Sequence, residues 1–518
     1  MSANLFSRLR SRFPGPDRLF ARLEDGRLYT YGHVLDVSAR FAATLRGMGV
    51  EPGDRVAVQV EKSAENLMLY LATLRVGAVY LPLNTAYTPA EIEYFLSDAE
   101  PRVFVCDPAS AEALTPIADK AGARLETMGV WAGDGGDHGS FFGHVPDDAP
   151  DEDAERGPDD LAAILYTSGT TGRSKGAMLT HANLWSNAET LVDAWRFTAD
   201  DLLIHALPVF HTHGLFVATH CVLASGSALH LLPKFDAGRI LDLMEGAAPE
   251  GSSEAKAPRA ASALMGVPTF YTRLLKEDRL AEAAKGMRLF TSGSAPLLAE
   301  THRAFERATG QRILERYGMT ETNMNTSNPY EGDRRAGTVG PPLPGVELRI
   351  LDGDREVGTD EVGTIEVRGP NVFKGYWRMP EKTAEELRPD GWFVTGDLGT
   401  RSADGYVTIV GRGKDLVISG GFNVYPKEVE DAIDALPGVV ESAVVGLPHD
   451  DLGEAVTAIV VPGADAPDEE AVLAGVRDTL ARYKQPKRVL FVDELPRNTM
   501  GKVQKNVLRD THAGLYRV

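Results

Sequence analysis

The sequence predicts an α/β protein. We expect a large N-terminal domain of layered α/β sheets with a β-rich subdomain, then a small C-terminal α+β domain. The length of 518 residues exceeds what one hydrophobic core usually supports. Strand-like and helix-like segments alternate over much of the chain, which is typical of a mostly parallel sheet covered by helices. Beyond residue 345, short strand-like runs between Gly and Asp turns replace that alternation. We therefore predict two domains, 1–411 and 412–518.

The N-terminal domain begins with helices and strands in alternation. Apolar residues at helical spacing predict helices, and short apolar runs predict strands. The predicted helices cover 30–46 and 64–76, and the predicted strands cover 55–60, 79–83 and 103–106. The segment 134–160 is rich in Gly, Asp and Pro, so we expect a long surface loop there.

After this loop the alternation resumes with a buried strand over 161–166 and continues through 201–245. The segment 247–262 contains small and polar residues, so we interpret it as a flexible insertion. A helix is expected from 266–275, and a strand over 289–297 ends in a Gly/Ser turn suited to close packing against a flat ring.

The β-rich subdomain and the C-terminal unit meet at a polar joint. The expected subdomain strands cover 347–352, 364–368 and 406–410. Gly411-Arg-Gly-Lys-Asp415 follows them, and we place the domain boundary at Gly411–Lys414. The C-terminal unit is expected to contain helices over 426–436 and 469–482 and strands over 439–446, 456–461 and 488–492.

Charge and composition exclude several classes of protein. The net charge of −20 argues against nucleic acid or an anionic membrane as the main partner, so an anionic ligand needs a local basic site. Cys106 and Cys221 lie far apart without metal-like spacing, which favours a reducing compartment. We find no signal-peptide pattern and no run of about 18 apolar residues, so we predict a cytoplasmic protein without a transmembrane helix.

The stretch Tyr166–Gly176 combines the features of a phosphate-binding loop. Glycines let the backbone approach an anion, successive N–H groups form an anion nest, and a lysine adds charge. The residues concerned are Thr167, Ser168, Gly169, Thr170, Thr171, Gly172 and Lys175. The alternative is an ordinary surface turn, which has a similar composition. The glycine and lysine spacing differs from that of the common P-loop.

This loop resembles the phosphate loop of the adenylate-forming superfamily of acyl-CoA synthetases, luciferases and peptide-synthetase adenylation domains. Further motifs of that superfamily follow in the same order: Tyr317-Gly-Met-Thr-Glu321, Thr395-Gly-Asp397, Gly411-Arg-Gly-Lys-Asp415 and Pro496-Arg-Asn-Thr-Met-Gly-Lys502. The segments Glu315–Asn325 and His211-Thr-His-Gly214 are similar to those of malonyl-CoA synthetases. The resemblance spans most of the chain.

The resemblance implies a nucleotide site with ATP and Mg²⁺ as cofactors. Tyr317 would stack on adenine beside Gly318, and Asp397 would accept hydrogen bonds from the ribose hydroxyls. Arg412 would reach the ribose or the phosphates. The turn Ser294, Ala295 and Pro296 would border the adenine and the acyl group. Thr320 would bind the α-phosphate, while Glu321 and Thr170 would hold Mg²⁺, which prefers hard oxygen ligands.

The resemblance also implies two catalytic conformations. Lys502 would bridge the acyl carboxylate and the α-phosphate during adenylation, where it stabilises transition-state charge. The small domain would then rotate about Lys414, as Gly-flanked polar joints often allow. The segment Gly420, Gly421 and Phe422 would next line the tunnel for coenzyme A.

Two arginines point to the acid that is activated. Arg316 occupies a position where many relatives have a small residue, and by resemblance Arg273 is a second cation of the acyl pocket. Guanidinium groups match a carboxylate in bidentate geometry, so a substrate with a second carboxylate follows. His211 and Ser292 would lie near the same pocket. The alternatives are structural salt bridges for the arginines and ordinary loop histidines at 211 and 213, since a metal site lacks further ligands.

We therefore predict an ATP-dependent malonate–CoA ligase that also accepts methylmalonate. Its expected partners are malonate, ATP and coenzyme A, with no nucleic acid and no membrane, and its oligomeric state stays open. The alternatives are an acyl-CoA synthetase for another short acid, a nucleotide-binding module without catalysis, and an adenylation enzyme that loads a carrier protein in trans.

Overall fold

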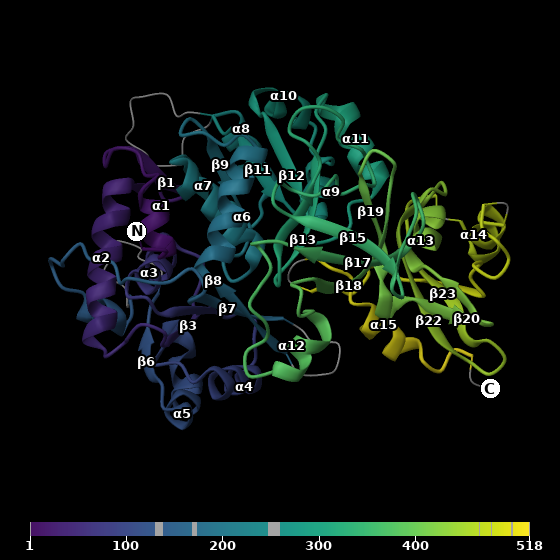
Figure 1. Ribbon diagram of the computed structural model, residues 1–518. Helices are drawn as coiled ribbons and strands as arrows, with labels where there is room; N and C mark the ends of the chain where they lie inside the picture. The colour runs from purple at the N-terminus through teal and green to yellow at the C-terminus, as the bar shows by residue number, and fades with distance from the viewer. Residues whose placement is uncertain are drawn as a thin grey trace.

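The computed structural model covers residues 1–518 and describes 2–129, 138–167, 174–246, 260–465, 467–477, 479–498 and 501–516. Four sheets organise the described chain (Figure 1). Two large sheets with helices around them lie in the N-terminal part, a small antiparallel sheet follows, and the fourth sheet belongs to the C-terminal part. This arrangement confirms the predicted fold class.

The six-stranded sheet carries the phosphate-loop segment at one edge. Its strand order is β6 (Arg124–Thr127), β5 (Val103–Cys106), β3 (Arg55–Gln59), β4 (Val79–Pro82), β7 (Leu161–Thr167) and β8 (Lys175–Thr180). The strands are parallel except for the antiparallel pair β7–β8. Helix α2 (Tyr31–Gly47) leads into β3, and helices α3 (Ala64–Arg75), α4 (Pro89–Ala99) and α5 (Ala111–Ala121) connect the strands that follow it. Every residue of α3 is buried, because the helix lies deep inside the domain.

The eight-stranded sheet ends in the strands that carry the acyl-pocket motifs. Its order is β14 (Asn323–Ser327), β13 (Leu314–Met319), β12 (Leu289–Ser292), β11 (Ala263–Gly266), β9 (Leu202–His205), β10 (Ala228–Leu231), β1 (Leu19–Leu23) and β2 (Leu28–Thr30). Its helices are α1 (Leu5–Arg10), α6 (His181–Ala194), α7 (His220–Ser225), α8 (Ala237–Met244), α9 (Pro268–Leu274), α10 (Leu280–Ala283) and α11 (Ala299–Thr309). Strands β11, β12 and β13 run parallel, so their carboxyl ends lie at one edge, where α/β sheets bind ligands.

The predicted β-rich subdomain is confirmed as an antiparallel sheet. Its order is β16 (Arg355–Glu356), β15 (Glu347–Asp352), β17 (Gly363–Arg368), β18 (Phe393–Arg401) and β19 (Val407–Arg412). The short helix α12 (Pro380–Glu386) lies between β17 and β18 in the chain and comes near the six-stranded sheet (Figure 1).

The C-terminal sheet contains only strands that follow the predicted boundary, although the boundary itself stays a prediction. Its order is β21 (Phe422–Val424), β20 (Val417–Ser419), β23 (Gly453–Pro462) and β22 (Val439–His449), with β24 (Arg488–Phe491) parallel to β23. Helices α13 (Pro426–Asp434), α14 (Glu469–Gly475) and α15 (Lys505–His512) complete it. The helix predicted over 469–482 was too long. It ends at Gly475, where a Cβ would meet the side chain of Leu436 at 2.7 Å.

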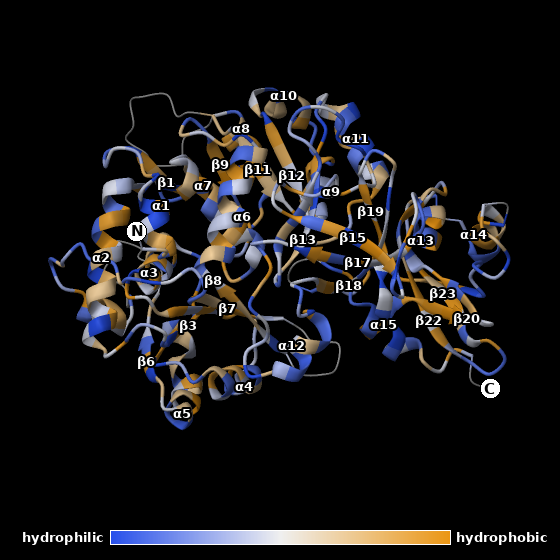
Figure 2. Cartoon of the chain, viewed as in Figure 1, coloured by the Kyte–Doolittle hydropathy of each residue, from blue (hydrophilic) through white to orange (hydrophobic). Residues whose placement is uncertain are grey.

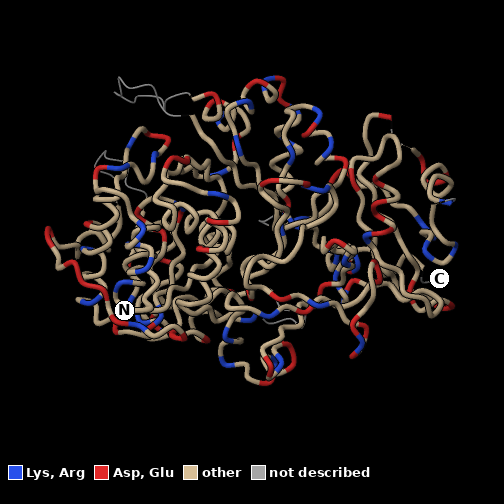
Figure 3. Tube along the Cα trace, turned by 45° about the horizontal axis from the view of Figure 1, so that its top comes forward, with Lys and Arg blue, Asp and Glu red and all other residues tan. Residues whose placement is uncertain are grey.

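Separate hydrophobic cores support the two parts of the chain. Figure 2 shows hydrophobic residues along the central strands, including β12, β17 and β23. One buried cluster extends from Leu5 to Val407, whereas the buried clusters of the C-terminal part extend from Val417 to Leu508. Acidic and basic residues are interspersed along the trace of both parts (Figure 3).

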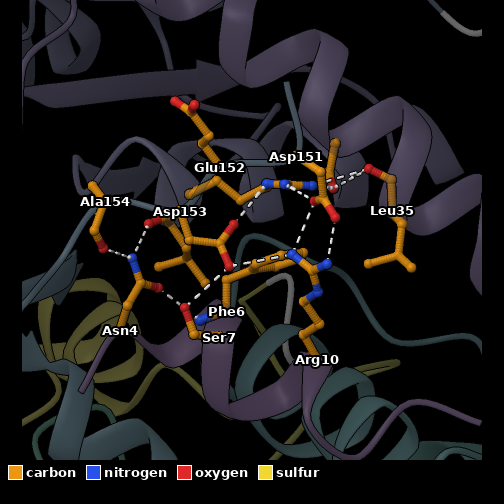
Figure 4. A network of polar contacts seen from close by, with 12 residues as sticks. Asn4, Phe6, Ser7, Arg10, Leu35, Asp151, Glu152, Asp153 and Ala154 are labelled. Carbon is orange, nitrogen blue, oxygen red and sulfur yellow. Dashed lines mark hydrogen bonds and ion pairs between the residues drawn. The ribbon is translucent and has the colours of Figure 1, made fainter. Parts of the chain in front are cut away.

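The predicted surface loop over 134–160 is only partly a surface loop, and residues 130–137 lie outside the described chain. Phe141 is fully buried, and Asp151 and Asp153 hold the buried side chain of Arg75. Figure 4 shows Arg10 and Ser7 of α1 in the same network. The loop is therefore fastened to the core by an ion pair that its composition did not reveal.

The Arg75 network is expected to stabilise the fold. The guanidinium donates to Oγ of Ser38 at 3.0 Å, and its Nε lies 3.0 Å from Oδ1 of Asp153. We expect Asp151→Asn combined with Asp153→Asn to lower the free energy of unfolding by about 3 kcal/mol, because the buried guanidinium of Arg75 loses both of its carboxylate partners. The melting temperature at pH 7, measured by calorimetry, tests this. The same changes at the exposed residues Asp147 and Asp148 serve as the control.

The stability that the double variant loses should depend on pH in a definite direction. Burial raises the pKa of Asp151, but the bonds to Arg75 and Arg10 more than offset it, so the pKa lies below its usual value. A lowered carboxyl pKa gives stability that is present above about pH 4 and is lost below it. The difference between wild type and the double variant should therefore shrink at pH 3.5. A constant difference would contradict an ionic origin.

Candidate active site

The phosphate-loop segment lies in the chain between β7 and β8, which pair as an antiparallel hairpin. Thr167 ends β7 and pairs with Lys175, which begins β8. The remaining predicted residues, Ser168, Gly169, Thr170, Thr171 and Gly172, lie outside the described residues, so their roles stay predictions. The hairpin nevertheless fixes the two ends of the segment.

Lys175 lies inside a polar cluster that the sequence did not predict. Its Nζ donates to the hydroxyl of Tyr376 at 3.1 Å and to the carboxylate of Glu386 at 3.2 Å. The same hydroxyl is 3.0 Å from Oε1 of Glu321. Lys175 and Glu321, predicted to bind phosphate and Mg²⁺, are thus joined through one tyrosine. No spacing in the sequence identifies Tyr376 or Glu386 as their partners.

Glu321 and Thr320 lie in the turn between β13 and β14. The turn depends on Gly318, because a Cβ there would lie 1.8 Å from the carbonyl oxygen of Asn323. Glu321 is 5% exposed, and burial raises its pKa. Within the described ranges, no group of three or more His, Cys, Asp or Glu side chains could hold a metal. A buried carboxylate fits a Mg²⁺ ion that takes its other oxygens from phosphates and water.

A second cluster brings together three residues predicted to bind the nucleoside. Tyr317 on β13 donates to Oδ2 of Asp397 at 2.5 Å, and Nε of Arg412 lies 2.6 Å from Oδ1 of the same carboxylate. Asp397 and Arg412 face each other across β18 and β19. The three motifs, distant in sequence, therefore form one site at the junction of two sheets.

Lys502 approaches this cluster from the C-terminal part. A Cβ on the preceding Gly501 would lie 3.4 Å from Oγ1 of Thr269 at the start of α9, so the lysine loop is docked on the large domain. Burial lowers the pKa of Lys502 to about 8, and the positive charges of Arg412 and Lys414 act in the same direction. The residue keeps exposed surface, but protein groups surround its ammonium group.

This pKa predicts a pH dependence for adenylation. Lys502 must be charged to stabilise the anionic transition state, so activity should fall as the pH rises through about 8. The measurement is kcat/KM for malonate-dependent ATP–pyrophosphate exchange between pH 6.5 and 9.5. Lys502→Arg keeps its charge across this range and should remove the decline. If both proteins decline at the same pH, another group is responsible.

Arg316 is a buried cation at the carboxyl edge of the eight-stranded sheet. It is 3% exposed, and its Nε and Nη2 have no hydrogen-bond partner in the described protein. Burial lowers its pKa to about 10, so the group remains charged at neutral pH. The guanidinium lies against Gly293, where a Cβ would be 2.2 Å from Nη1. Such a charge is costly without an anion.

Two histidines lie near this cation, and two serines flank the glycine that it contacts. Burial and Arg316 lower the pKa of His211 to about 4, and His213 is shifted in the same direction, so both are neutral at pH 7. Nδ1 of His213 lies 3.1 Å from Oγ of Ser294, and the buried Oγ of Ser292 has no partner in the described protein. His213 begins a π-helix over His213–Thr219, a feature frequent at functional sites. Sequence reasoning gave His213 no role. Ala295 and Pro296 follow on the same turn.

Other predicted residues lie apart from these clusters. The exposed side chain of Arg273 on α9 lies 5.6 Å from the ring of Phe235, and no contact with Arg316 is seen among the described residues. Gly420 and Gly421 form the turn of the β20–β21 hairpin with φ of 60° and 81°. Phe422 beside them is 57% exposed. Their roles toward acyl group and coenzyme A stay predictions.

Family comparison identifies the architecture that carries these clusters. The model of the AMP-binding enzyme family matches residues 10–377, and the model of the AMP-binding enzyme C-terminal domain matches residues 428–502. The chain belongs to the AMP-binding enzyme family. The predicted membership among AMP-forming acid–thiol ligases is thereby confirmed.

The family relatives match nearly the whole chain. A malonate–CoA ligase of Arabidopsis thaliana is 36% identical over 521 residues, which cover 94% of this chain and 85% of that protein. The ATP-bound crystal structure of MatB from Rhodopseudomonas palustris is 57% identical with a TM-score of 0.94, and 100% of both chains is covered. The apo structure of that MatB gives a TM-score of 0.84 at the same identity and coverage. In the described part of the chain, no helix is long and apolar enough to cross a membrane.

Proposed function

We propose that this protein is an ATP-dependent malonate–CoA ligase that also accepts methylmalonate. The observation that carries the choice of acid is the buried guanidinium of Arg316, whose Nε and Nη2 lack a hydrogen-bond partner in the described protein. A second carboxylate on the substrate would accept hydrogen bonds from these nitrogens. The similarity to a malonate–CoA ligase supports the same choice.

The proposed first step joins malonate to AMP. One carboxylate oxygen of malonate attacks the α-phosphorus of ATP, and the bond to pyrophosphate breaks, giving malonyl-AMP. The protein contributes positioning and charge. Lys502 and Arg412 would stabilise the negative charge of the transition state, and Asp397 would orient the ribose. When bound at Glu321, Mg²⁺ would neutralise phosphate charge.

The second carboxylate of malonate would be held by Arg316. Neighbouring His211 and His213 are neutral at pH 7, so they add hydrogen-bond capacity without competing charge. Arg316 then selects for an anion, and acids without a second carboxylate would leave it unpaired. A methyl group on malonate changes shape but keeps this pairing.

The proposed second step forms the thioester. The sulfur of coenzyme A attacks the carbonyl carbon of malonyl-AMP, the thiol proton passes to solvent, and AMP leaves. Lys502 would withdraw as the C-terminal domain turns about Lys414, and the hairpin with Phe422 would face the site. Lys414 lies in a short 3-10 turn between β19 and β20, where the chain passes from the subdomain sheet to the C-terminal sheet.

A substitution at this joint tests the turning. Lys414→Pro restricts φ, so we expect it to slow the thioester step about tenfold, a barrier increase of roughly 1.4 kcal/mol, with less effect on adenylation. Single-turnover transfer from malonyl-AMP to coenzyme A and ATP–pyrophosphate exchange measure the two steps. Lys414→Ala is the control without the restriction. Parallel changes in both steps would show that the joint is elsewhere.

The function itself is tested by product analysis. The protein is incubated with ATP, Mg²⁺ and coenzyme A plus malonate, methylmalonate, acetate or butyrate, and acyl-CoA and AMP are measured. We expect malonyl-CoA with malonate, and much less product with acetate or butyrate. Acyl transfer only to an added carrier protein would favour the carrier-loading alternative. Preference for a neutral acid would overturn the proposal. The buried free thiols Cys106 and Cys221 fit the cytoplasmic location that we propose.

A further inference from the structure

Helix α12 places a carboxylate on the lysine that is expected to bind phosphate. Both oxygens of Glu386 contact Nζ of Lys175, at 3.2 and 3.3 Å. The hydroxyl of Tyr376 contacts the same carboxylate and also the ammonium group. Lys175 is buried and Glu386 is partly buried, so water screens this pair less than a surface pair.

The backbone fixes this arrangement. The segment 374–377 runs beside β8 and exchanges hydrogen bonds with Gly176 and Met178 at 2.7 to 2.9 Å. Tyr376 pairs with Ala177 there, and α12 starts a few residues later. The hydroxyl of Thr383 on α12 accepts a hydrogen bond from the N–H of Tyr376 at 2.9 Å. Glu386 is therefore carried to Lys175 by secondary structure.

A carboxylate at this position is unfavourable for a nucleotide. The phosphates of ATP or pyrophosphate would need the charge of Lys175, but both carboxylate oxygens of Glu386 already contact its ammonium group. Like charges close together repel by several times the thermal energy in a partly buried site. Lys382, whose Nζ lies 2.9 Å from Glu386 on the same helix, could retain the carboxylate after Lys175 is released.

We propose that Glu386 competes with the phosphates of ATP and pyrophosphate for Lys175. The carboxylate stands where a phosphate oxygen would bind, and an arriving polyphosphate takes the lysine from it. When pyrophosphate leaves, Glu386 pairs with Lys175 again, which favours product release. This inference rests on the proposed ATP-dependent adenylation, because it assigns Lys175 to the phosphates.

The test is direct binding of pyrophosphate and ATP, each in EDTA without Mg²⁺, measured by titration calorimetry. We expect Glu386→Gln to lower the Kd for both ligands about fivefold or more, since the competing charge is lost while the hydrogen-bonding shape is kept. Glu385→Gln is the matched control. Glu385 lies one residue away on α12, is exposed, pairs with Lys382 at 2.7 Å, and changes the net charge equally. This control should alter the Kd by less than about twofold.

The same variants give a kinetic readout. Pyrophosphate should inhibit Glu386→Gln more strongly than wild type in the forward reaction, while KM for malonate stays unchanged. If Glu385→Gln and Glu386→Gln change binding and inhibition by pyrophosphate equally, the proposal is overturned, because the effect then comes from the change in net charge and not from the contact with Lys175. If Glu386→Gln instead binds pyrophosphate and ATP more weakly, as expected for Lys175→Ala, the proposal is also overturned. Glu386 would then hold the side chain of Lys175 in its binding orientation.

The two proposals can fail separately. Tighter nucleotide binding by Glu386→Gln in a protein that makes no malonyl-AMP would support the competition and overturn the choice of acid. Malonyl-CoA formation with unchanged nucleotide binding in Glu386→Gln would support the function and overturn the competition.

Discussion

Replacing Lys502 with alanine is expected to lower the rate of malonyl-AMP formation about a hundredfold to a thousandfold, the scale of losing one transition-state charge contact. Thioester formation from supplied malonyl-AMP should remain largely intact. The reason is geometric: Lys502 is docked beside Asp397 and Arg412 through a loop of the C-terminal part, and that loop is proposed to leave for the second step.

ATP–pyrophosphate exchange and single-turnover transfer to coenzyme A measure the two halves of the Lys502→Ala reaction. Lys505→Ala is the control, because Lys505 lies on the same segment but pairs with Glu430 at 2.6 Å. It should leave both halves close to wild type. An equal loss of both halves in Lys502→Ala would contradict the division of labour.

Replacing Arg316 should have the second large effect. Arg316→Met keeps much of the volume and removes the charge. We expect kcat/KM for malonate to fall by at least about a hundredfold, because breaking one side of a buried ion pair costs about 3–5 kcal/mol. Acetate and butyrate should gain relative to malonate, since the unpaired guanidinium that disfavours them is gone. Arg316→Gly should change the selectivity in the same direction, and it should also enlarge the acyl pocket.

Stability separates a binding role for Arg316 from a structural one. A buried cation without a partner destabilises the unliganded fold, so Arg316→Met should raise the melting temperature, whereas losing a structural salt bridge should lower it. Arg273→Met provides the comparison, because Arg273 is exposed over Phe235 and should matter less to malonate. Unchanged malonate selectivity together with a lower melting temperature would make Arg316 structural.

The local parts of the fold were predictable because they depend on local patterns. The spacing of apolar residues and the positions of turn residues predicted the alternating α/β part, the β-rich subdomain and most elements of the C-terminal part. The over-long helix at 469–482 shows the limit: apolar periodicity continued, but the helix ends at Gly475, which packs closely against Leu436. A packing partner in another element is invisible to a local pattern.

The site was predictable as a set of motifs but not as a set of contacts. The order of motifs pointed to Tyr317, Asp397 and Arg412, and the structure joins them. The partners of Lys175 are 201 and 211 residues away in sequence, and no spacing links a lysine to Tyr376 or Glu386 over that distance. For the same reason the anchoring of Asp151 and Asp153 on Arg75 was missed.

The contact between Arg316 and Gly293 constrains the order in which substitutions could change the acid specificity of the enzyme. While arginine is present, any side chain at 293 would collide with its guanidinium. The backbone of Gly293 lies outside the left-handed region, so it would not itself forbid a side chain. Once Arg316 is lost, position 293 becomes free to vary. A side chain gained there would fill the space and bar the return of arginine. Loss of the arginine followed by such a gain would therefore be hard to reverse, and a library that restores dicarboxylate use would have to vary both positions together.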